Sequence, residues 1–192
     1  MEKKDFHVGL VGWGLYLPEN YITAEELSPQ INIPANIIKE KMGFCKKPLG
    51  GPEDHCVAMG IKAAKQCLQK TGVDPQDIDL IIWAGEDYKE YVCWTASIAV
   101  QEAIGAKNAW AFDSALRCAG TPLSLKLAKD LMFANPEIKT VLIAGGNTNC
   151  YLIDYRRPEQ SFMFDMAPSG LAMLLKRDWL EYEVLESHII TD

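Results

Sequence analysis

Short apolar blocks alternate along the chain with segments whose apolar residues recur every three or four positions. Continuous apolar runs are typical of strands buried on both faces, whereas the three- and four-residue spacing predicts helices that bury one face. The predicted strands span residues 6–17, 78–84, 109–112 and 140–144. The predicted helices span residues 54–70, 95–104 and 118–133. Strands that alternate with helices predict an α/β fold, with a mostly parallel sheet on which the helices pack.

The ends of the predicted elements carry residues suited to those positions. Thr23, with Glu26 three residues later, predicts a capping box at the start of a short helix. Asp54 is placed to cap the helix over 54–70, and residues 37–42 predict another short helix. Beyond residue 160, the pattern predicts further strands at 161–164, 171–175 and 181–189.

Composition narrows the class of protein. The chain has 192 residues, of which 48% are hydrophobic and 23% charged, and this predicts one domain with a substantial core. The net charge of −7 and the absence of a basic stripe argue against nucleic acid or anionic lipid as a general partner. No apolar run in the sequence reaches the roughly 18 residues of a membrane span. The N-terminal pattern predicts a strand and turn rather than a signal peptide, so we expect a cytoplasmic protein.

The cysteines and histidines lack the spacing of a metal site. Six cysteines lie at positions 45, 56, 67, 93, 118 and 150, with no CxxC pair, and the three histidines are scattered. We therefore predict no metal, and thiols that stay reduced. Cys118 differs from the others because it falls between a predicted strand and the first turn of a predicted helix. That setting makes it a candidate nucleophile.

The start of a helix favours a reactive thiol. Unpaired backbone N–H groups and the helix dipole favour the thiolate, and Arg117 adds a neighbouring positive charge. A thiolate can attack a thioester and hold the acyl group as a new thioester. Ala119 and Gly120 leave room beside the sulfur. On spacing alone, a buried cysteine that only fills the core is the alternative interpretation.

The segment Phe112-Asp113-Ser114-Ala115-Leu116-Arg117-Cys118-Ala119-Gly120 resembles the nucleophile motif of β-ketoacyl-ACP synthase III, a condensing enzyme of the thiolase superfamily. Segments 12–18, 72–79, 141–146 and 187–192 resemble other parts of that family in the same order. The resemblance implies a thiolase-like fold, of which residues 1–192 form one βαβαβαββ half as a single domain. It also implies a Claisen condensation through an acyl group on Cys118, in fatty acid or polyketide biosynthesis. The implied substrate is acyl-CoA, with acyl carrier protein as a further candidate partner and no bound cofactor.

A second resemblance is to HMG-CoA synthase. Lys41-Met42-Gly43-Phe44-Cys45 is similar to a stretch of that family, and Glu86 falls where the family keeps its general base. The resemblance implies that Glu86 deprotonates the methyl group of a bound acetyl thioester. A solvated loop carboxylate is the alternative interpretation of Glu86.

Several positions depart from the pattern of synthase III. Lys41 replaces an arginine near the CoA site, and it can still meet a phosphate as a point charge. Ile37 replaces a tryptophan that helps to hold CoA, and Val92 replaces a phenylalanine that lines the partner subunit's acyl tunnel. Pro168 interrupts a glycine-rich loop and has no N–H to donate. Acyl and carrier specificity therefore stay open.

Both families complete their active site with a histidine, usually accompanied by an asparagine, from the second half of the fold. We expect that half to be absent from residues 1–192, and we do not expect His188 to replace its histidine. Three functions therefore remain as alternatives: a synthase III-like enzyme, an HMG-CoA synthase-like enzyme, and a non-catalytic half that binds a partner supplying the rest. Both families imply a homodimer formed largely through this half.

Overall fold

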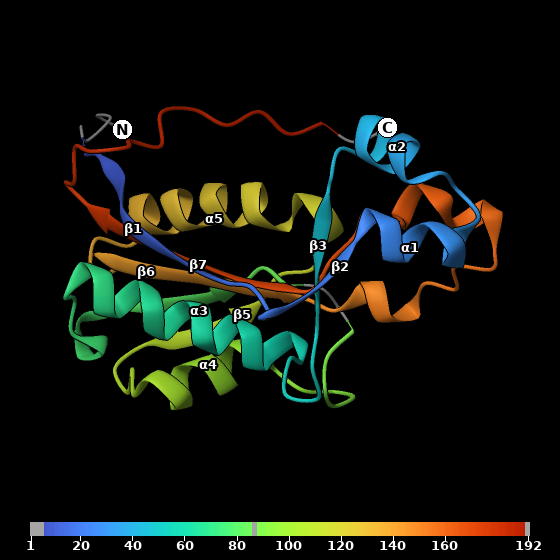
Figure 1. The fold of residues 1–192 in the computed structure, drawn as a ribbon. Coiled ribbons are helices and arrows are strands. Elements are labelled where there is room, and N and C mark those ends of the chain that lie inside the picture. The colour runs from blue at the N-terminus through green and yellow to red at the C-terminus, as the bar shows by residue number, and fades with distance from the viewer. Residues whose placement is uncertain (1–5, 86–87, 191–192) are drawn as a thin grey trace.

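A five-stranded sheet forms the centre of the computed structural model, which describes residues 6–85 and 88–190 (Figure 1). In spatial order the strands are β1 (Val8–Tyr16), β7 (Ser169–Arg177), β6 (Thr140–Asn147), β4 (Leu80–Trp83) and β5 (Trp110–Asp113). β4 pairs in parallel with β5 and β6, while β7 is antiparallel to both β6 and β1. All strands except β7 therefore run in the same direction, which confirms the predicted mostly parallel sheet.

Three helices cover the two faces of this sheet. α3 (Cys56–Thr71) and α4 (Ala96–Ile104) pack on one face, and α5 (Gly120–Ala134) packs on the other (Figure 1). Apart from an inserted lobe between β1 and α3, the chain order is β1, α3, β4, α4, β5, α5, β6 and β7. This order is the predicted βαβαβαββ pattern.

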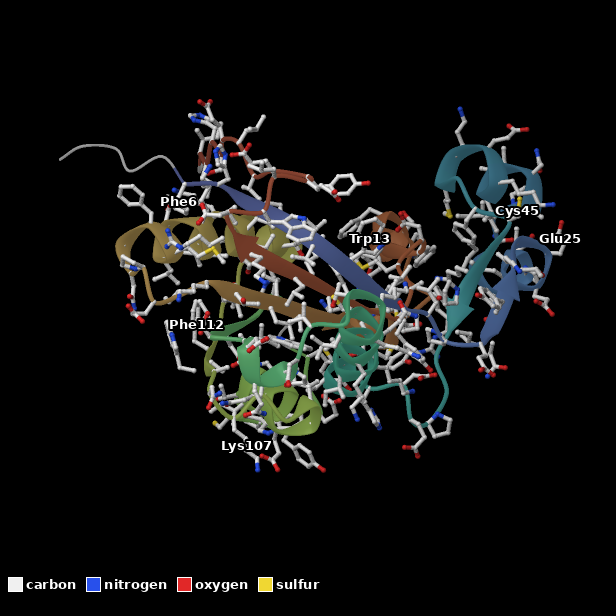
Figure 2. The ribbon with its side chains drawn as sticks, turned by 90° about the vertical axis from the view of Figure 1, so that its left-hand side faces the viewer. Phe6, Trp13, Glu25, Cys45, Lys107 and Phe112 are labelled. Carbon is white, nitrogen blue, oxygen red and sulfur yellow. The ribbon has the colours of Figure 1, made fainter. Side chains whose placement is uncertain are left out.

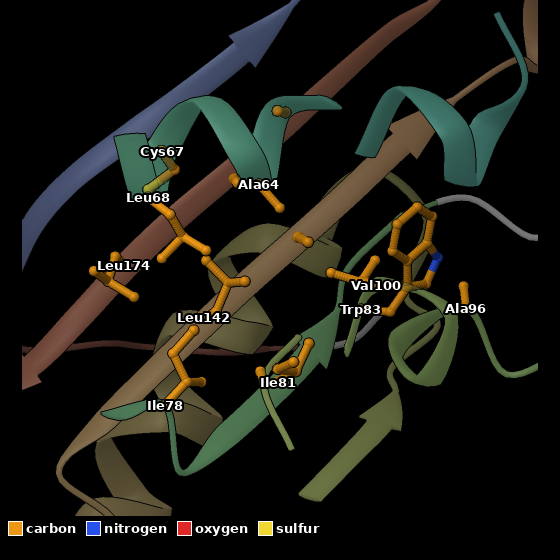
Figure 3. Close-up of a cluster of buried hydrophobic side chains, with 14 of the residues drawn as sticks. Ala64, Cys67, Leu68, Ile78, Ile81, Trp83, Ala96, Val100, Leu142 and Leu174 are labelled. Atoms are coloured by element: carbon orange, nitrogen blue, oxygen red, sulfur yellow. The ribbon is translucent and has the colours of Figure 1, made fainter. Parts of the chain in front are cut away.

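The larger core lies between the sheet and the layer formed by α3 and α4 (Figure 3). Leu142 of β6 projects toward Ala64 and Leu68 of α3, and Ile81 of the neighbouring strand β4 belongs to the same cluster. Trp83 is completely buried at the end of β4. Each large side chain of this kind stabilises the fold by about 1.5–3 kcal/mol when it leaves water. Because β4 and β6 are buried on both faces, their sequences are continuously apolar.

Glycines allow α3 to approach the sheet closely. A Cβ atom added to Gly14 would lie 2.0 Å from the carbonyl oxygen of Ala63, and one added to Gly146 would lie 1.9 Å from that of Cys56. A Cβ atom on Gly170 would lie 2.1 Å from another backbone oxygen of the same helix. β1, β6 and β7 therefore each present bare backbone to α3, which leaves no room for a side chain at these points.

The inserted lobe, at the right of Figure 2, packs around a small apolar core to which Phe164, from the segment after β6, also contributes. It contains β2 (Asn20–Thr23), α1 (Ala24–Ile31), α2 (Ala35–Ile37), a π-helical turn (Ile38–Met42) and β3 (Lys46–Leu49). Thr23 and Glu26 form the predicted capping box, with the N–H of Thr23 donating to the Glu26 carboxylate at 2.8 Å. The sequence pattern does not predict the pair β2 and β3, because a four-residue strand that contains Pro48 has too little alternation to be recognised.

The prediction that Asp54 caps α3 is wrong. Its carboxylate instead accepts hydrogen bonds from the Tyr16 hydroxyl at 2.7 Å, the Lys62 ammonium at 3.0 Å and the Gly51 N–H at 2.9 Å. Burial alone would raise the pKa of Asp54, but these donors together hold that pKa below its usual range. The side chain joins the end of β1 to α3, so tertiary partners outcompete the local cap.

Two of the strands predicted near the C-terminal end are also wrong. Residues 161–164 lie largely in a 3₁₀ helix, Pro158–Met163, because successive i to i+3 backbone bonds form after Pro158. Residues 181–189 form only one antiparallel bridge in the described part of the chain, between Glu183 and Gly9. The N–H of Val184 donates to the oxygen of Val8, and the N–H of Leu10 donates to the oxygen of Tyr182. The segment therefore covers the outer edge of β1 only next to this bridge. The remaining predicted strand, 171–175, lies inside β7 and is confirmed.

On the sheet face that carries α5, the part formed by β1 and the start of β7 is only partly covered, and Tyr182 makes an edge-to-face contact with Trp13 there. Gly12 and Gly14 of β1 face α3, so the intervening residues Trp13 and Leu15 point to the opposite face. Trp13 is 50% exposed and Leu15 is 47% exposed. Their paired residues on β7, Met173 and Leu171, lie on the same face and are only half-buried.

Candidate active site

The candidate nucleophile lies where β5 passes into α5. β5 ends at Asp113, a 3₁₀ turn follows over Arg117–Ala119, and α5 begins at Gly120. Cys118 is exposed in the described structure and does not lie in a core cluster. Arg117 adopts a positive φ of 46°, which marks a sharp bend just before the cysteine. A Cβ atom on Gly120 would lie 3.0 Å from the carbonyl oxygen of Ala84, so the start of α5 lies directly against the end of β4.

Cys118 opens into a pocket of about 150 Å³. The pocket is lined by Ala84, Gly85, Arg117, Cys118, Thr121, Gly145, Gly146, Asn147, Ser169 and Leu171. These residues come from the carboxyl ends of the parallel strands β4 and β6, the turn after β5, and the start of β7. In open α/β sheets, ligands bind at the carboxyl edge of the strands, and this pocket lies at that edge.

Four of the lining residues, Gly145, Gly146, Thr121 and Ser169, are small or polar. The sequence pattern alone does not identify them as part of a functional site. Gly145 and Gly146 continue β6 to Asn147. A Cβ atom on Gly145 would crowd the backbone of Ala84 and Gly85, and one on Gly146 would meet α3, so these glycines allow close packing around the pocket. Thr121 and Ser169 reach the pocket from α5 and β7, and only the pairing of strands distant in sequence brings them together.

Asp113 ties the segment before Cys118 to two other elements. One oxygen of its carboxylate accepts from the Lys89 ammonium at 2.6 Å and the Ala96 N–H at 2.9 Å. The other accepts from the N–H and the hydroxyl of Ser97, at 2.9 and 2.7 Å. Burial alone would raise the pKa of Asp113, but the donors Lys89, Ser97 and Ala96 hold that pKa below its usual range. The carboxylate thus caps the start of α4 from a neighbouring strand.

The loop after β4 is fixed by contacts with three elements. Lys89 bonds to Asp113, and the hydroxyl of Thr148 donates to the carbonyl of Tyr88 at 3.1 Å. Glu90 accepts from the N–H groups of Val57 and Ala58 at 2.9 and 3.0 Å. Glu90, rather than Asp54, therefore provides the carboxylate at the start of α3.

The other residues proposed from the sequence lie apart from Cys118 or outside the described structure. Glu86 is outside the described residues, although its neighbour Gly85 lines the pocket. Lys41 is an exposed residue of the π-helical turn in the inserted lobe and does not line the pocket. Val92 is 92% exposed in the loop after β4. Pro168 directly precedes the lining residue Ser169.

Solved structures of condensing enzymes share this fold. The priming β-ketosynthase from the R1128 polyketide biosynthetic pathway matches with a TM-score of 0.80 and 25% identity, over 88% of this chain and 49% of that chain. A 3-oxoacyl-[acyl-carrier-protein] synthase III from Aquifex aeolicus VF5 matches with a TM-score of 0.78, over 88% of this chain and 53% of that chain. The fold and the cysteine at the start of α5 place the chain in the thiolase superfamily of condensing enzymes.

Within that superfamily, the chain is similar to the 3-oxoacyl-[acyl-carrier-protein] synthase III family. Residues 112–192 match the family model of that name. A relative from Clostridium perfringens with the name β-ketoacyl-[acyl-carrier-protein] synthase III is 34% identical over 139 residues, which is 72% of this chain and 42% of the relative. One from Clostridium tetani is 33% identical over 171 residues, which is 89% of this chain and 50% of the relative. The chain spans about half the length of the curated relatives that it matches.

Proposed function

We propose that the chain is the nucleophile-bearing half of a 3-oxoacyl-ACP synthase III-like enzyme that joins two acyl units. The observation that carries this proposal is the exposed Cys118 thiol in a pocket at the carboxyl edge of the sheet, directly before a 15-residue helix. A helix start stabilises a developing thiolate through its free N–H groups and its dipole. The pocket beside the sulfur, of about 150 Å³, provides space for a small acyl group.

In the first step, Cys118 Sγ attacks the carbonyl carbon of an acyl-CoA thioester. The Cys118 S–C bond forms, the bond from the carbonyl carbon to the CoA sulfur breaks, and CoA leaves as a thiol after it takes up a proton. A second thioester then provides a carbanion that attacks the acyl-cysteine, so that the new carbon–carbon bond forms and the Cys118 thiolate is released. Incubation with acetyl-CoA followed by intact-mass analysis tests the first step, and a chain that gains no acetyl group contradicts the proposal.

Two sources of the carbanion remain, and Glu86 distinguishes them. If malonyl-ACP is the donor, decarboxylation makes the carbanion and no base is required. If acetyl-CoA is the donor, a base must remove a methyl proton, and we propose Glu86 because its neighbour Gly85 lines the Cys118 pocket. Replacing Glu86 by glutamine is then expected to lower condensation by about 10²- to 10⁴-fold, the usual contribution of a general base.

The measurement compares the rate of condensation in Glu86→Gln and the unchanged full-length enzyme with each donor in turn. Loss with acetyl-CoA alone supports the HMG-CoA synthase-like reaction. Full activity of Glu86→Gln with both donors removes Glu86 from the mechanism and leaves the synthase III-like reaction. Acylation of Cys118, measured in the same samples, shows whether the variant still binds its first substrate.

We also propose that a second half of the fold covers the exposed face formed by Trp13, Leu15, Leu171 and Met173. Trp13 and Leu15 of β1 are each about half exposed, and neighbouring exposed apolar side chains are typical of a surface that another part of a protein covers. In the described residues, no histidine lines the Cys118 pocket, so a second half also accounts for the missing catalytic partner. The non-catalytic alternative uses the same face, with the second half supplied by another protein.

The intact mass of the native protein from its source cells tests this proposal. We expect a mass about twice the 21.4 kDa of the present chain, because one gene product would then contain both halves. A native mass of 21.4 kDa would instead favour a separate partner that supplies the second half. Sedimentation of the same sample tests the proposed homodimer, which we place at β5 because that strand pairs only with β4 among the described residues.

The proposed ligands are acyl-CoA and an acyl carrier protein, with Lys41 as a phosphate contact. Lys41 is exposed on the inserted lobe and does not line the Cys118 pocket, so the contact that we propose is with the phosphates of CoA outside that pocket. Among the described residues, none of the helices is both long enough and apolar enough to cross a bilayer. The cytoplasmic location stays a prediction from the sequence.

A further inference from the structure

The Asp113 carboxylate lies where three segments around the candidate nucleophile meet. It ends β5, five residues before Cys118, and it receives four hydrogen bonds from Lys89, Ala96 and Ser97. Its side chain is 20% exposed and that of Lys89 is 16% exposed, so the ion pair between them is largely shielded from water. Shielded, charge-assisted contacts are stronger than those at an open surface.

The contacts on either side of Asp113 reach the Cys118 pocket. The N–H of the next residue, Ser114, donates to the carbonyl of Trp83 at 2.9 Å, and its hydroxyl lies 3.1 Å from that of Ser124 in α5. Lys89 also donates to the carbonyl of Trp94 at 3.1 Å, which closes the loop after β4 on itself. Gly85 at the start of this loop and Cys118 both line the pocket. The Asp113 carboxylate therefore fixes the loop after β4 relative to the turn that carries Cys118, and these two segments form the two walls of the pocket.

We propose that Asp113 is a positioning residue that holds the Cys118 turn in register with the loop after β4. The expected effect on acylation of Cys118 rests on the proposed function. The ordering of the two segments by Asp113 does not depend on that reaction. The carboxylate does not line the pocket, so it acts through the backbone of residues 114–118 and through Lys89. A displacement of about 1 Å in a reacting group can lower a rate by about 10²-fold, which is the scale on which such a residue matters.

Replacing Asp113 by asparagine preserves the shape of the side chain but reverses part of its hydrogen bonding. If the amide oxygen keeps the two contacts with Ser97, the NH₂ group faces the Lys89 ammonium and the Ala96 N–H, which are both donors. The opposite rotamer places the NH₂ group against the Ser97 N–H, while the Ser97 hydroxyl can turn to accept from it. Either way, at least one favourable contact becomes unfavourable and the negative charge that pairs with Lys89 is lost, so the two walls of the pocket are held less firmly.

The test uses Asp113→Asn in the full-length enzyme, with acylation by acetyl-CoA, alkylation by iodoacetamide and backbone hydrogen exchange as readouts. We expect acylation of Cys118 to fall by about 10- to 100-fold. Alkylation, which requires only an accessible thiolate, should change far less. Exchange should rise in residues 88–97 and 114–120 while α3 and β6 stay protected. If Asp113→Asn acted only by removing a negative charge near the thiolate, acylation of Cys118 would become faster instead of slower.

Three further variants separate this positioning role from a general loss of stability or of charge. Asp130→Asn is the matched control, because Asp130 also lies 2.6 Å from a lysine, Lys126, but on the exposed side of α5. Lys89→Met removes the ion pair and leaves the cap of α4 intact. If Asp113→Asn does not fold, Lys89→Met therefore tests whether the contact between Asp113 and Lys89 positions the Cys118 turn. Lys89→Arg should restore most of the acylation rate that Lys89→Met loses.

Acylation and exchange in Asp113→Asn equal to those in Asp130→Asn would overturn the inference. If the unchanged enzyme takes no acetyl group, the proposed function fails, and hydrogen exchange alone then decides whether Asp113 orders the two segments. A folded Lys89→Met variant with unaltered exchange in residues 88–97 would also contradict the proposal.

Discussion

Replacing Cys118 by serine is expected to abolish the uptake of an acyl group from acetyl-CoA, with a loss of roughly 10³-fold or more in rate. Serine keeps the size of the side chain, but its hydroxyl ionises far less readily than a thiol. The start of α5 cannot compensate, since helix N–H groups and the dipole stabilise an adjacent anion by only about 0.3–1 kcal/mol. The fold should be unaffected because Cys118 is exposed and packs into no core cluster of the described residues.

Cys45→Ser provides the matched control for this prediction. Cys45 is also exposed, but it lies in the inserted lobe, between the π-helical turn and β3. Intact-mass analysis after incubation with acetyl-CoA should show the acetyl group on Cys45→Ser and not on Cys118→Ser. An acetyl group that persists in Cys118→Ser would move the nucleophile elsewhere and would remove the basis of the proposed mechanism.

Replacing Gly14 by alanine is expected to destabilise the fold by about 3 kcal/mol or more. The new Cβ atom would lie 2.0 Å from the Ala63 carbonyl oxygen and 2.7 Å from the Cys67 nitrogen. Both atoms belong to the backbone of α3, so relief requires the helix to move away from the sheet. That movement would open the largest core cluster, which includes Cys67. A domain of this size is stable by roughly 5–15 kcal/mol, so the loss is readily measured by urea unfolding.

Gly51→Ala is the control for this second prediction. A Cβ atom on Gly51 would meet only the Asp54 carboxylate, at 3.5 Å, which is an ordinary contact distance. The midpoint of its urea unfolding curve should therefore lie close to that of the unchanged protein. Equal midpoints for Gly14→Ala and Gly51→Ala would mean that α3 can lie farther from β1 at no cost.

The parts of the fold that the sequence predicts are those fixed by neighbouring residues. The capping box at Thr23 depends on Glu26 three residues away, and β4 and β6 are continuous apolar runs because both faces are buried. The capping residue of α3 escapes prediction because Glu90 lies more than thirty positions beyond the N–H groups that it meets. Local reasoning selects Asp54 instead, and that carboxylate has stronger partners in Tyr16 and Lys62.

The residues of the candidate site can likewise be divided into those that the local sequence predicts and those that depend on contacts distant in the chain. Cys118 can be selected from the sequence because a strand end, a cysteine and a helix start are adjacent in the chain. Thr121, Asn147 and Ser169 cannot, because only the pairing of β6 with β4 and β7 brings their elements to one edge. Glu86 and Lys41 rest on resemblance, and their roles stay predictions.

The two ends of the sheet differ in a way that bears on how copies of the chain can assemble. At one end, residues 182–184 occupy the edge of β1 through the contacts of Leu10 with Tyr182 and of Val184 with Val8. At the other end, β5 has only β4 beside it among the described residues. Two copies that joined β5 to β5 in the proposed homodimer would use both of these open edges. Residues 182–184 protect β1 only near Gly9, so the pairing of β5 would remove the longer exposed edge at which further copies could add.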